Sequence, residues 1–163
     1  MKTFATANRL ERARWYMGGY WVFLATAKET GGRFSLIETN LRKGFEPPRH
    51  THTKEDESFY LLEGEVNFFV GDEEFSLSPN MFLHIPRNTP HHFKLVSDTA
   101  KMLMHLSPGG LEEMFLEMSV PASSLSYPDA PQGPPPQAWL EKMLALQKEF
   151  GIAGMDKSQI KAT

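Results

Sequence analysis

Cysteine is absent from the 163 residues of this chain. Disulfides and thiolate metal sites are therefore excluded, and any metal ion must be held by nitrogen and oxygen ligands. No apolar run is long enough to span a bilayer. Residues 1–14 have no apolar block behind their charges, so we expect no secretory signal and a cytoplasmic protein.

The chain also has no excess of basic over acidic residues. The formal net charge is −3, so the composition favours neither nucleic acid nor an anionic membrane as a partner. With 40% hydrophobic and 23% charged residues, the chain is ordinary for a soluble globular protein. Its length suits one domain with a sizeable core.

Short strand-forming segments follow one another through the first two thirds of the chain, separated by turns rich in glycine and proline. Gly71-Asp72 is typical of a hairpin turn, and Thr30-Gly31-Gly32 of a turn. Many short strands at close intervals predict an all-β domain, an antiparallel sandwich or jelly roll. The expected strands cover residues 20–25, 33–39, 65–70, 74–77, 81–85, 91–96 and 101–106.

One or two C-terminal α-helices are expected after the strands. Apolar residues at helical spacing predict an amphipathic helix over residues 110–118. A second helix is predicted over 138–150, because Pro136 stands near its start and Gly151 just past its end.

A proline-rich segment joins these helices. Six prolines between residues 120 and 137 predict an extended linker or a strap over the barrel, without regular helix or strand. We therefore expect residues 1–108 to form the barrel with its N-terminal strands. Residues 109–163 are expected to form the helix, the strap and a second helix packed on the barrel, with the last dozen residues frayed.

The most informative stretch is residues 44–64, which contains two histidines, a glutamate and two framing glycines. His50 and His52 are two positions apart, so on a strand they face one side, about 7 Å apart along it. From there both imidazoles can tilt onto one metal ion.

Glu57 lies an odd number of residues beyond His52, so on a straight strand it would face the other side. The polar segment 53–56 must therefore bend to bring Glu57 back. Phe59 and Leu61 then share its face and are expected to place an apolar wall beside the ligands.

A fourth candidate ligand, His91, follows a second turn-rich segment. Pro86 and Pro90 fix two backbone φ angles, so a rigid turn and a strand would aim His91, Phe93 and Leu95 to one face. Three imidazoles and one carboxylate suit Fe(II), Mn(II), Ni(II), Zn(II) or Cu(II), and residue type does not choose among these ions.

Other interpretations of these residues stay open. A His-x-His pair can arise by chance among six histidines, and Glu57 can belong to a solvated acidic run. We expect His84 and His105 to be satisfied histidines of the core or of a groove, and His92 to face outward.

The arrangement resembles the first sequence motif of the cupin superfamily, G-x5-H-x-H-x(3,4)-E-x6-G. The fixed positions of that motif are all matched, by Gly44, His50, His52, Glu57 and Gly64.

The second cupin motif, G-x5-P-x-G-x2-H-x3-N, is matched less closely, by Asn80, Pro86, Asn88, His91 and Leu95. Asparagine replaces both glycines, and leucine replaces the closing asparagine. Asparagine is the residue after glycine that best tolerates a positive φ, so we expect both turns to persist. The change at Leu95 is expected to cost a turn or cap contact and to leave the metal site unaffected.

The resemblance covers roughly residues 20–108. It implies a cupin jelly-roll β-barrel, often a homodimer, with a divalent transition metal bound by His50, His52, Glu57 and His91. Within the superfamily, the stretches around these ligands look like single-domain quercetin-dioxygenase-like proteins.

This closer resemblance implies a metal-dependent dioxygenase acting on a small aromatic or enolisable hydroxyl substrate. Glu57 would be both a ligand and the catalytic base, and Phe59, Leu61 and Phe93 would line the substrate pocket. Two alternatives remain: a metal-dependent isomerase or lyase, and a non-catalytic module that binds a small molecule.

An aromatic-rich first segment gives a separate reason to expect a homodimer, because aromatic residues are common at interfaces. The alternative is that the C-terminal helices cover these side chains. The segment contains Trp15, Tyr16, Tyr20, Trp21 and Phe23.

Overall fold

The computed structural model describes residues 3–130 and 133–154. Its strands are β1 (Ala13–Tyr16), β2 (Gly19–Ala25), β3 (Ser35–Arg42), β4 (Thr51–His52), β5 (Asp56–Glu63), β6 (Val66–Val70), β7 (Glu73–Leu77), β8 (Phe82–Ile85), β9 (His91–Leu95), β10 (Thr99–Ser107), β11 (Val120–Pro121) and β12 (Ile152–Ala153). The helices are the 3-10 turn η1 (Leu10–Arg12) and α1 (Ala27–Thr30), α2 (Glu112–Met118) and α3 (Gln137–Phe150).

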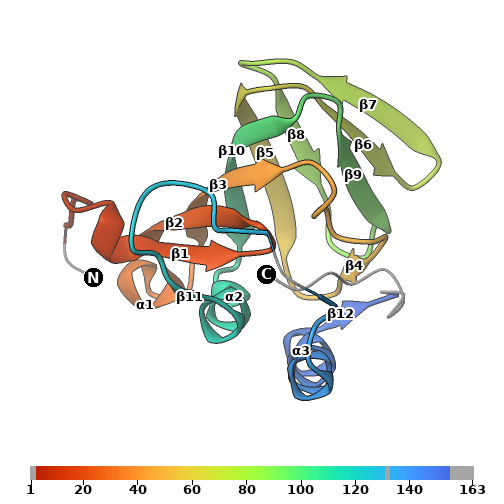
Figure 1. The fold of residues 1–163 in the computed structure, drawn as a ribbon. Helices are drawn as coiled ribbons and strands as arrows, with labels where there is room; N and C mark the ends of the chain where they lie inside the picture. The colour runs from red at the N-terminus through yellow and green to blue at the C-terminus, as the bar shows by residue number, and fades with distance from the viewer. Residues whose placement is uncertain (1–2, 131–132, 155–163) are drawn as a thin grey trace.

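Two antiparallel sheets face each other and enclose the core (Figure 1). The larger sheet has the order β11-β1-β2-β3-β10-β5-β8, the smaller has the order β7-β6-β9, and β4 pairs with β12 beside them. Fully buried side chains from both sheets meet between them, among them Ile37 and Leu61 from the larger sheet and Phe68 from the smaller. The all-β jelly roll predicted from the sequence is confirmed.

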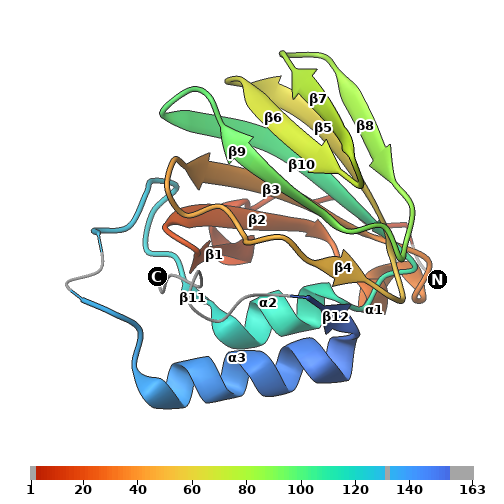
Figure 2. The same ribbon diagram turned by 90° about the vertical axis from the view of Figure 1, so that its right-hand side faces the viewer.

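The two C-terminal helices lie together on one side of the sheets (Figure 2). Helix α2 contacts β1, and α3 contacts α2 and β12. Gly151 ends α3 in the left-handed conformation, with φ 78°, as its place after the helix predicts. No helix in the described part of the chain is long and apolar enough to cross a membrane.

Three short elements differ from expectation. Val120–Pro121 lie in the segment expected to have no strand, yet they pair with β1. They form the outermost strand of the sheet, where a proline is tolerated although it has no backbone N–H to donate. Ile152–Ala153 belong to the end expected to fray, yet they pair with β4. The turn expected at Thr30 is preceded by helix α1, whose start is closed by a capping box between Thr26 and Glu29. The rest of the expected frayed end, 155–163, lies outside the described residues.

The aromatic first segment is covered largely by the chain itself. Tyr16 and Trp21 are buried and both pack against Phe115 of α2. Trp15 Nε1 donates a hydrogen bond to the Ser126 carbonyl, at 2.9 Å. These contacts favour the alternative that the C-terminal part covers the segment, and the homodimer stays a prediction.

Two asparagines stand in the left-handed conformation predicted for them, with φ 73° at Asn80 and 65° at Asn88. The backbone N–H of Asn88 donates to the His52 carbonyl at 2.7 Å. The turn before His91 is thereby joined to the strand that contains His52.

Replacing Asn88 by alanine should lower the free energy of unfolding by about 1 kcal/mol, because a Cβ without a compensating side-chain amide is strained at positive φ. Replacing it by glycine should change that free energy by less than about 0.5 kcal/mol. Urea unfolding of both variants measures the difference. Equal destabilisation by alanine and glycine would show that the backbone conformation is not the cause.

Candidate metal centre

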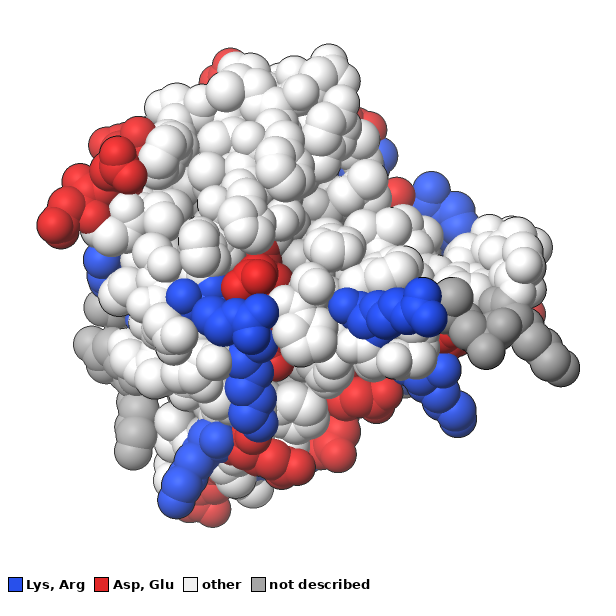
Figure 3. All heavy atoms as spheres, turned by 180° about the vertical axis from the view of Figure 1, so that it is seen from behind, with Lys and Arg blue, Asp and Glu red and all other residues white. Residues whose placement is uncertain are grey.

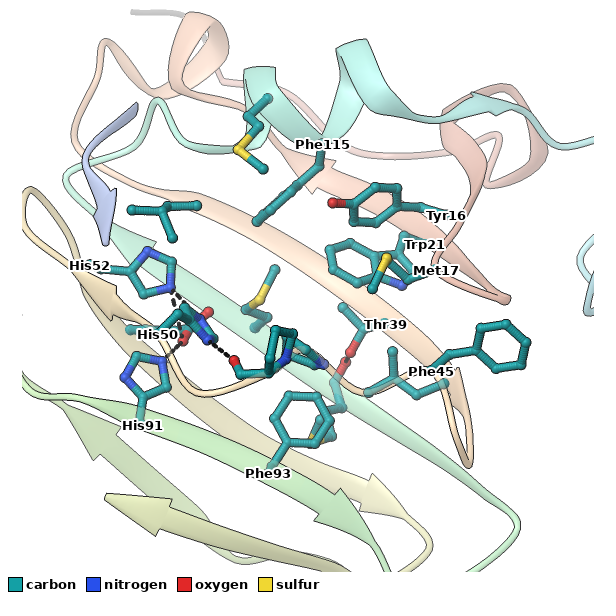
Figure 4. Close-up of a pocket in the computed structure, with 18 of the residues that line it drawn as sticks. Tyr16, Met17, Trp21, Thr39, Phe45, His50, His52, His91, Phe93 and Phe115 are labelled. Carbon is teal, nitrogen blue, oxygen red and sulfur yellow. Dashed lines mark hydrogen bonds and ion pairs between the residues drawn. The ribbon is translucent and has the colours of Figure 1, made fainter. Parts of the chain in front are cut away.

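Three histidines and one glutamate from separate parts of the chain converge at one end of the barrel (Figure 4). His50 lies just before β4, His52 in β4, Glu57 on β5 and His91 at the start of β9. Each is at most 7% exposed. One ligand atom from each lies within 4.8 Å of the others.

The backbone holds these side chains in place. A bend at Thr53-Lys54 separates β4 from β5 and turns Glu57 towards the two histidines, as its odd spacing requires. His50 and His91 exchange backbone hydrogen bonds in both directions, at 2.9 and 2.8 Å. The two segments that supply the ligands are thus fastened directly to each other.

Hydrogen bonds to carbonyls fix the protonation of two rings. His50 Nδ1 lies 2.8 Å from the Pro48 carbonyl and His91 Nδ1 lies 2.8 Å from that of Thr89. A carbonyl only accepts, so each Nδ1 must carry the proton, and in the neutral rings each Nε2 has a free lone pair.

Each of these nitrogens faces another candidate ligand. His50 Nε2 lies 3.0 Å from His52 Nε2, and His91 Nε2 lies 3.0 Å from a carboxylate oxygen of Glu57. Each of these pairs requires a proton or a metal ion between its two atoms, because two lone pairs at such distances repel each other. The donor set therefore fits a divalent metal ion held by nitrogen and oxygen.

The protonation of the centre suits the same ion. Burial would raise the pKa of Glu57, but His52 and His91 outweigh it and lower this pKa to about 2. Burial, together with His52 and His91, lowers the pKa of His50 to about 3, and burial also lowers that of His52. Burial alone would lower the pKa of His91, but the hydrogen bond and the negative charge of Glu57 outweigh burial, so this pKa is raised. At neutral pH the centre offers an ionised carboxylate and imidazoles that are neutral at His50 and His52.

An apolar cavity of about 80 Å³ opens beside the four ligands. Phe59 and Phe93 line it, as expected from their strands. Leu61 was expected in the same wall, but this expectation was wrong. It is the next inward-facing residue on β5 after Phe59, and the core encloses it completely, so it does not reach the cavity.

The other histidines lie apart from the four ligands. His84 was expected in the core or a groove but is exposed, and its Nδ1 lies 2.9 Å from the Ser58 hydroxyl. His105 is half-buried and stacks on Phe34. His92 is half-buried and stacks on Phe69.

Two parts of the site could not be found from the sequence. The cavity is closed on one side by Met143 and Gln147 of α3 and by Ile152 of β12. The apolar stripe of α3 indicated that this helix docks somewhere, but not where. Glu55 looked like one member of a solvated acidic run, yet it is 4% exposed.

Glu55 is a neighbour of the metal ligands. Its Oε2 lies 3.9 Å from His52 Nδ1, and neither atom has a hydrogen-bond partner among the described residues. When His52 binds an ion through Nε2, its Nδ1 must carry a proton, and the carboxylate is placed to face that proton.

The comparisons with known proteins agree with this geometry. Residues 37–110 match the family model of the cupin domain. Over 109 residues, 67% of the chain, the sequence is 35% identical to quercetin 2,3-dioxygenase of Bacillus subtilis (strain 168). Over 69 residues, 42% of the chain, it is 35% identical to the polyketide synthase CurC of Streptomyces cyaneus. The matched parts make up 32% and 45% of these relatives, so the chain spans less than half of each.

Solved structures share the fold at low sequence identity. KdgF from Halomonas sp. aligns with a TM-score of 0.53 and 18% identity, over 59% of this chain and 85% of that one. Pac13 from Streptomyces, described as a nucleoside dehydratase, aligns with a TM-score of 0.55 and 15% identity, over 69% and 88%. At these identities the likeness shows the fold alone.

Replacing Glu55 by glutamine should weaken metal binding by about 10-fold to 100-fold, the usual effect of removing a partner of a ligating histidine. Burial raises the pKa of Glu55 to about 7, so the titration should be done at pH 8, where the wild-type carboxylate is mostly ionised. The matched control is Asp56→Asn. Asp56 belongs to the same acidic run but pairs with Arg87 at the surface. Equal metal affinities of the two variants would contradict a role for Glu55.

Proposed function

This chain is a member of the cupin superfamily, and we propose that it is a metal-dependent oxygenase acting on a small aromatic or enolisable hydroxyl substrate. The observation that carries the proposal is the convergence of imidazole lone pairs and an ionised carboxylate at the end of an apolar cavity. The 35% identity to a quercetin dioxygenase supports the choice of chemistry.

His50, His52, Glu57 and His91 would hold the ion. Residue type leaves iron, manganese, nickel, zinc and copper open. When bound, the ion supplies Lewis acidity, which lowers the pKa of a hydroxyl group placed on it.

The residues of the chain do the rest. Glu57 is ionised and fully buried beside the ligand nitrogens, so it can accept the proton of a substrate hydroxyl whose own pKa has been lowered. Phe59 and Phe93 exclude water from the electron-rich anion that remains. Dioxygen is the co-substrate that this anion would reduce.

A homodimer is part of the proposal, although the aromatic first segment is mostly covered. Met81 and Phe82 are 44% and 63% exposed at the edge strand β8. Seen from behind, the upper part of the molecule, where Figure 1 places β8, has few charged side chains (Figure 3). Exposed apolar groups of this kind are typical of surfaces that meet a partner.

Protein loaded separately with each candidate metal should consume oxygen when given catechol or quercetin, in an oxygen-electrode assay. Glu57→Gln should reduce the rate by about 100-fold or more, because it removes the base and a ligand charge. The matched control is Glu63→Gln on the same strand, where Glu63 is exposed and pairs with Lys101.

Three outcomes separate the alternatives. Oxygen uptake that depends on the metal and on Glu57 supports the oxygenase. Product formation under strict anaerobiosis supports the isomerase or lyase. Binding without chemical change, on protein shown by elemental analysis to hold its metal, supports a non-catalytic binding module.

A further inference from the structure

Tyr16, at the end of β1, presents its hydroxyl group to the cavity beside the metal centre. The side chain is 4% exposed and lines the same space as the four ligands. Trp21 and Phe115 hold its ring, at centroid distances of 4.9 and 5.7 Å. The hydroxyl points towards the space between Phe115 and the histidines (Figure 4). No described residue forms a hydrogen bond with it.

A hydroxyl that lines a cavity and has no partner among the described residues can bond to a ligand that enters the cavity. Burial raises the pKa of Tyr16 well above its ordinary value, so the group stays protonated and can donate. The Tyr16 hydroxyl is thus a donor at the wall of the cavity without a partner among the described residues, which is the arrangement expected where an acceptor oxygen binds.

The remainder of the wall limits the charge of a ligand. Most of the lining side chains are aromatic rings, methionines or aliphatic groups, and the Thr39 hydroxyl is already bonded to the Met102 carbonyl. No Lys or Arg occurs among the described residues that line the cavity. An anionic group placed away from the metal would therefore be buried without a counter-charge, which is strongly unfavourable.

The size of the cavity limits the ligand further. Its volume of about 80 Å³ is smaller than the roughly 150 Å³ of an engineered apolar cavity known to admit benzene. A single ring therefore fits with less rearrangement of the wall than a molecule with several fused rings.

We propose that Tyr16 is a substrate-binding residue, and that the substrate is a neutral single-ring molecule with a metal-binding hydroxyl at one end and an acceptor oxygen at the other. This inference rests on the proposed function in one respect, since it places the first hydroxyl on the metal.

A pair of catechols of nearly equal shape tests the acceptor oxygen. In 3,4-dihydroxyacetophenone the ring has an acetyl oxygen, and in 4-isopropylcatechol a methyl group stands in its place. Calorimetry in the absence of oxygen measures the binding constant of each catechol for zinc-loaded protein. The preference ratio is the binding constant of 3,4-dihydroxyacetophenone divided by that of 4-isopropylcatechol, and it is measured without turnover. Tyr16→Phe should lower this ratio about fivefold, the effect of one neutral hydrogen bond. The electronic difference between the two catechols cancels when the ratio is compared between variants.

The matched control is Tyr20→Phe, the same substitution at a half-buried tyrosine that packs edge-to-face against Tyr127 and does not line the cavity. It should leave the ratio unchanged, and thermal unfolding should show both variants folded. An unchanged ratio in Tyr16→Phe would overturn the role of Tyr16 while leaving the oxygenase proposal standing. Tighter binding of quercetin than of 3,4-dihydroxyacetophenone would overturn the size limit. A fivefold loss in Tyr16→Phe would support the inference even if no oxygen is consumed.

Discussion

The pair of backbone hydrogen bonds between His50 and His91 is the constraint on which the rest of the site depends. It joins two segments 41 residues apart in the sequence at the point where their imidazoles meet. Carbonyls of the same two segments then fix the protons on Nδ1 and leave the Nε2 lone pairs facing inward. An arrangement that suits a cation is thus built by the backbone as much as by the side chains, because rings free to rotate would turn their lone pairs away from each other.

Much of this could be predicted from the sequence. The spacing of His50, His52 and Glu57 indicates both a shared face and an intervening bend, and each follows from the two-residue period of a strand. The asparagines at 80 and 88 could be assigned a positive φ because few other side chains tolerate it. These inferences succeed because they depend on local geometry, which neighbouring residues determine.

The parts that could not be predicted depend on contacts between distant segments. Glu55 is polar and lies in an acidic run, so nothing nearby in the sequence distinguishes it from its half-buried neighbour Asp56. Leu61 has the correct face but lies too deep in the barrel, and strand periodicity contains no information on depth. The pairing of β12 with β4 requires knowledge of where α3 docks, which an amphipathic stripe alone does not provide.

The cavity beside the candidate metal centre is closed on one side by residues that come late in the chain. All four ligands precede α3 and β12, and Ile152 pairs directly with His52. During synthesis the strands of the barrel therefore leave the ribosome before α3 and β12. The four candidate ligands therefore precede, along the polypeptide, the segments that close one side of the cavity beside them.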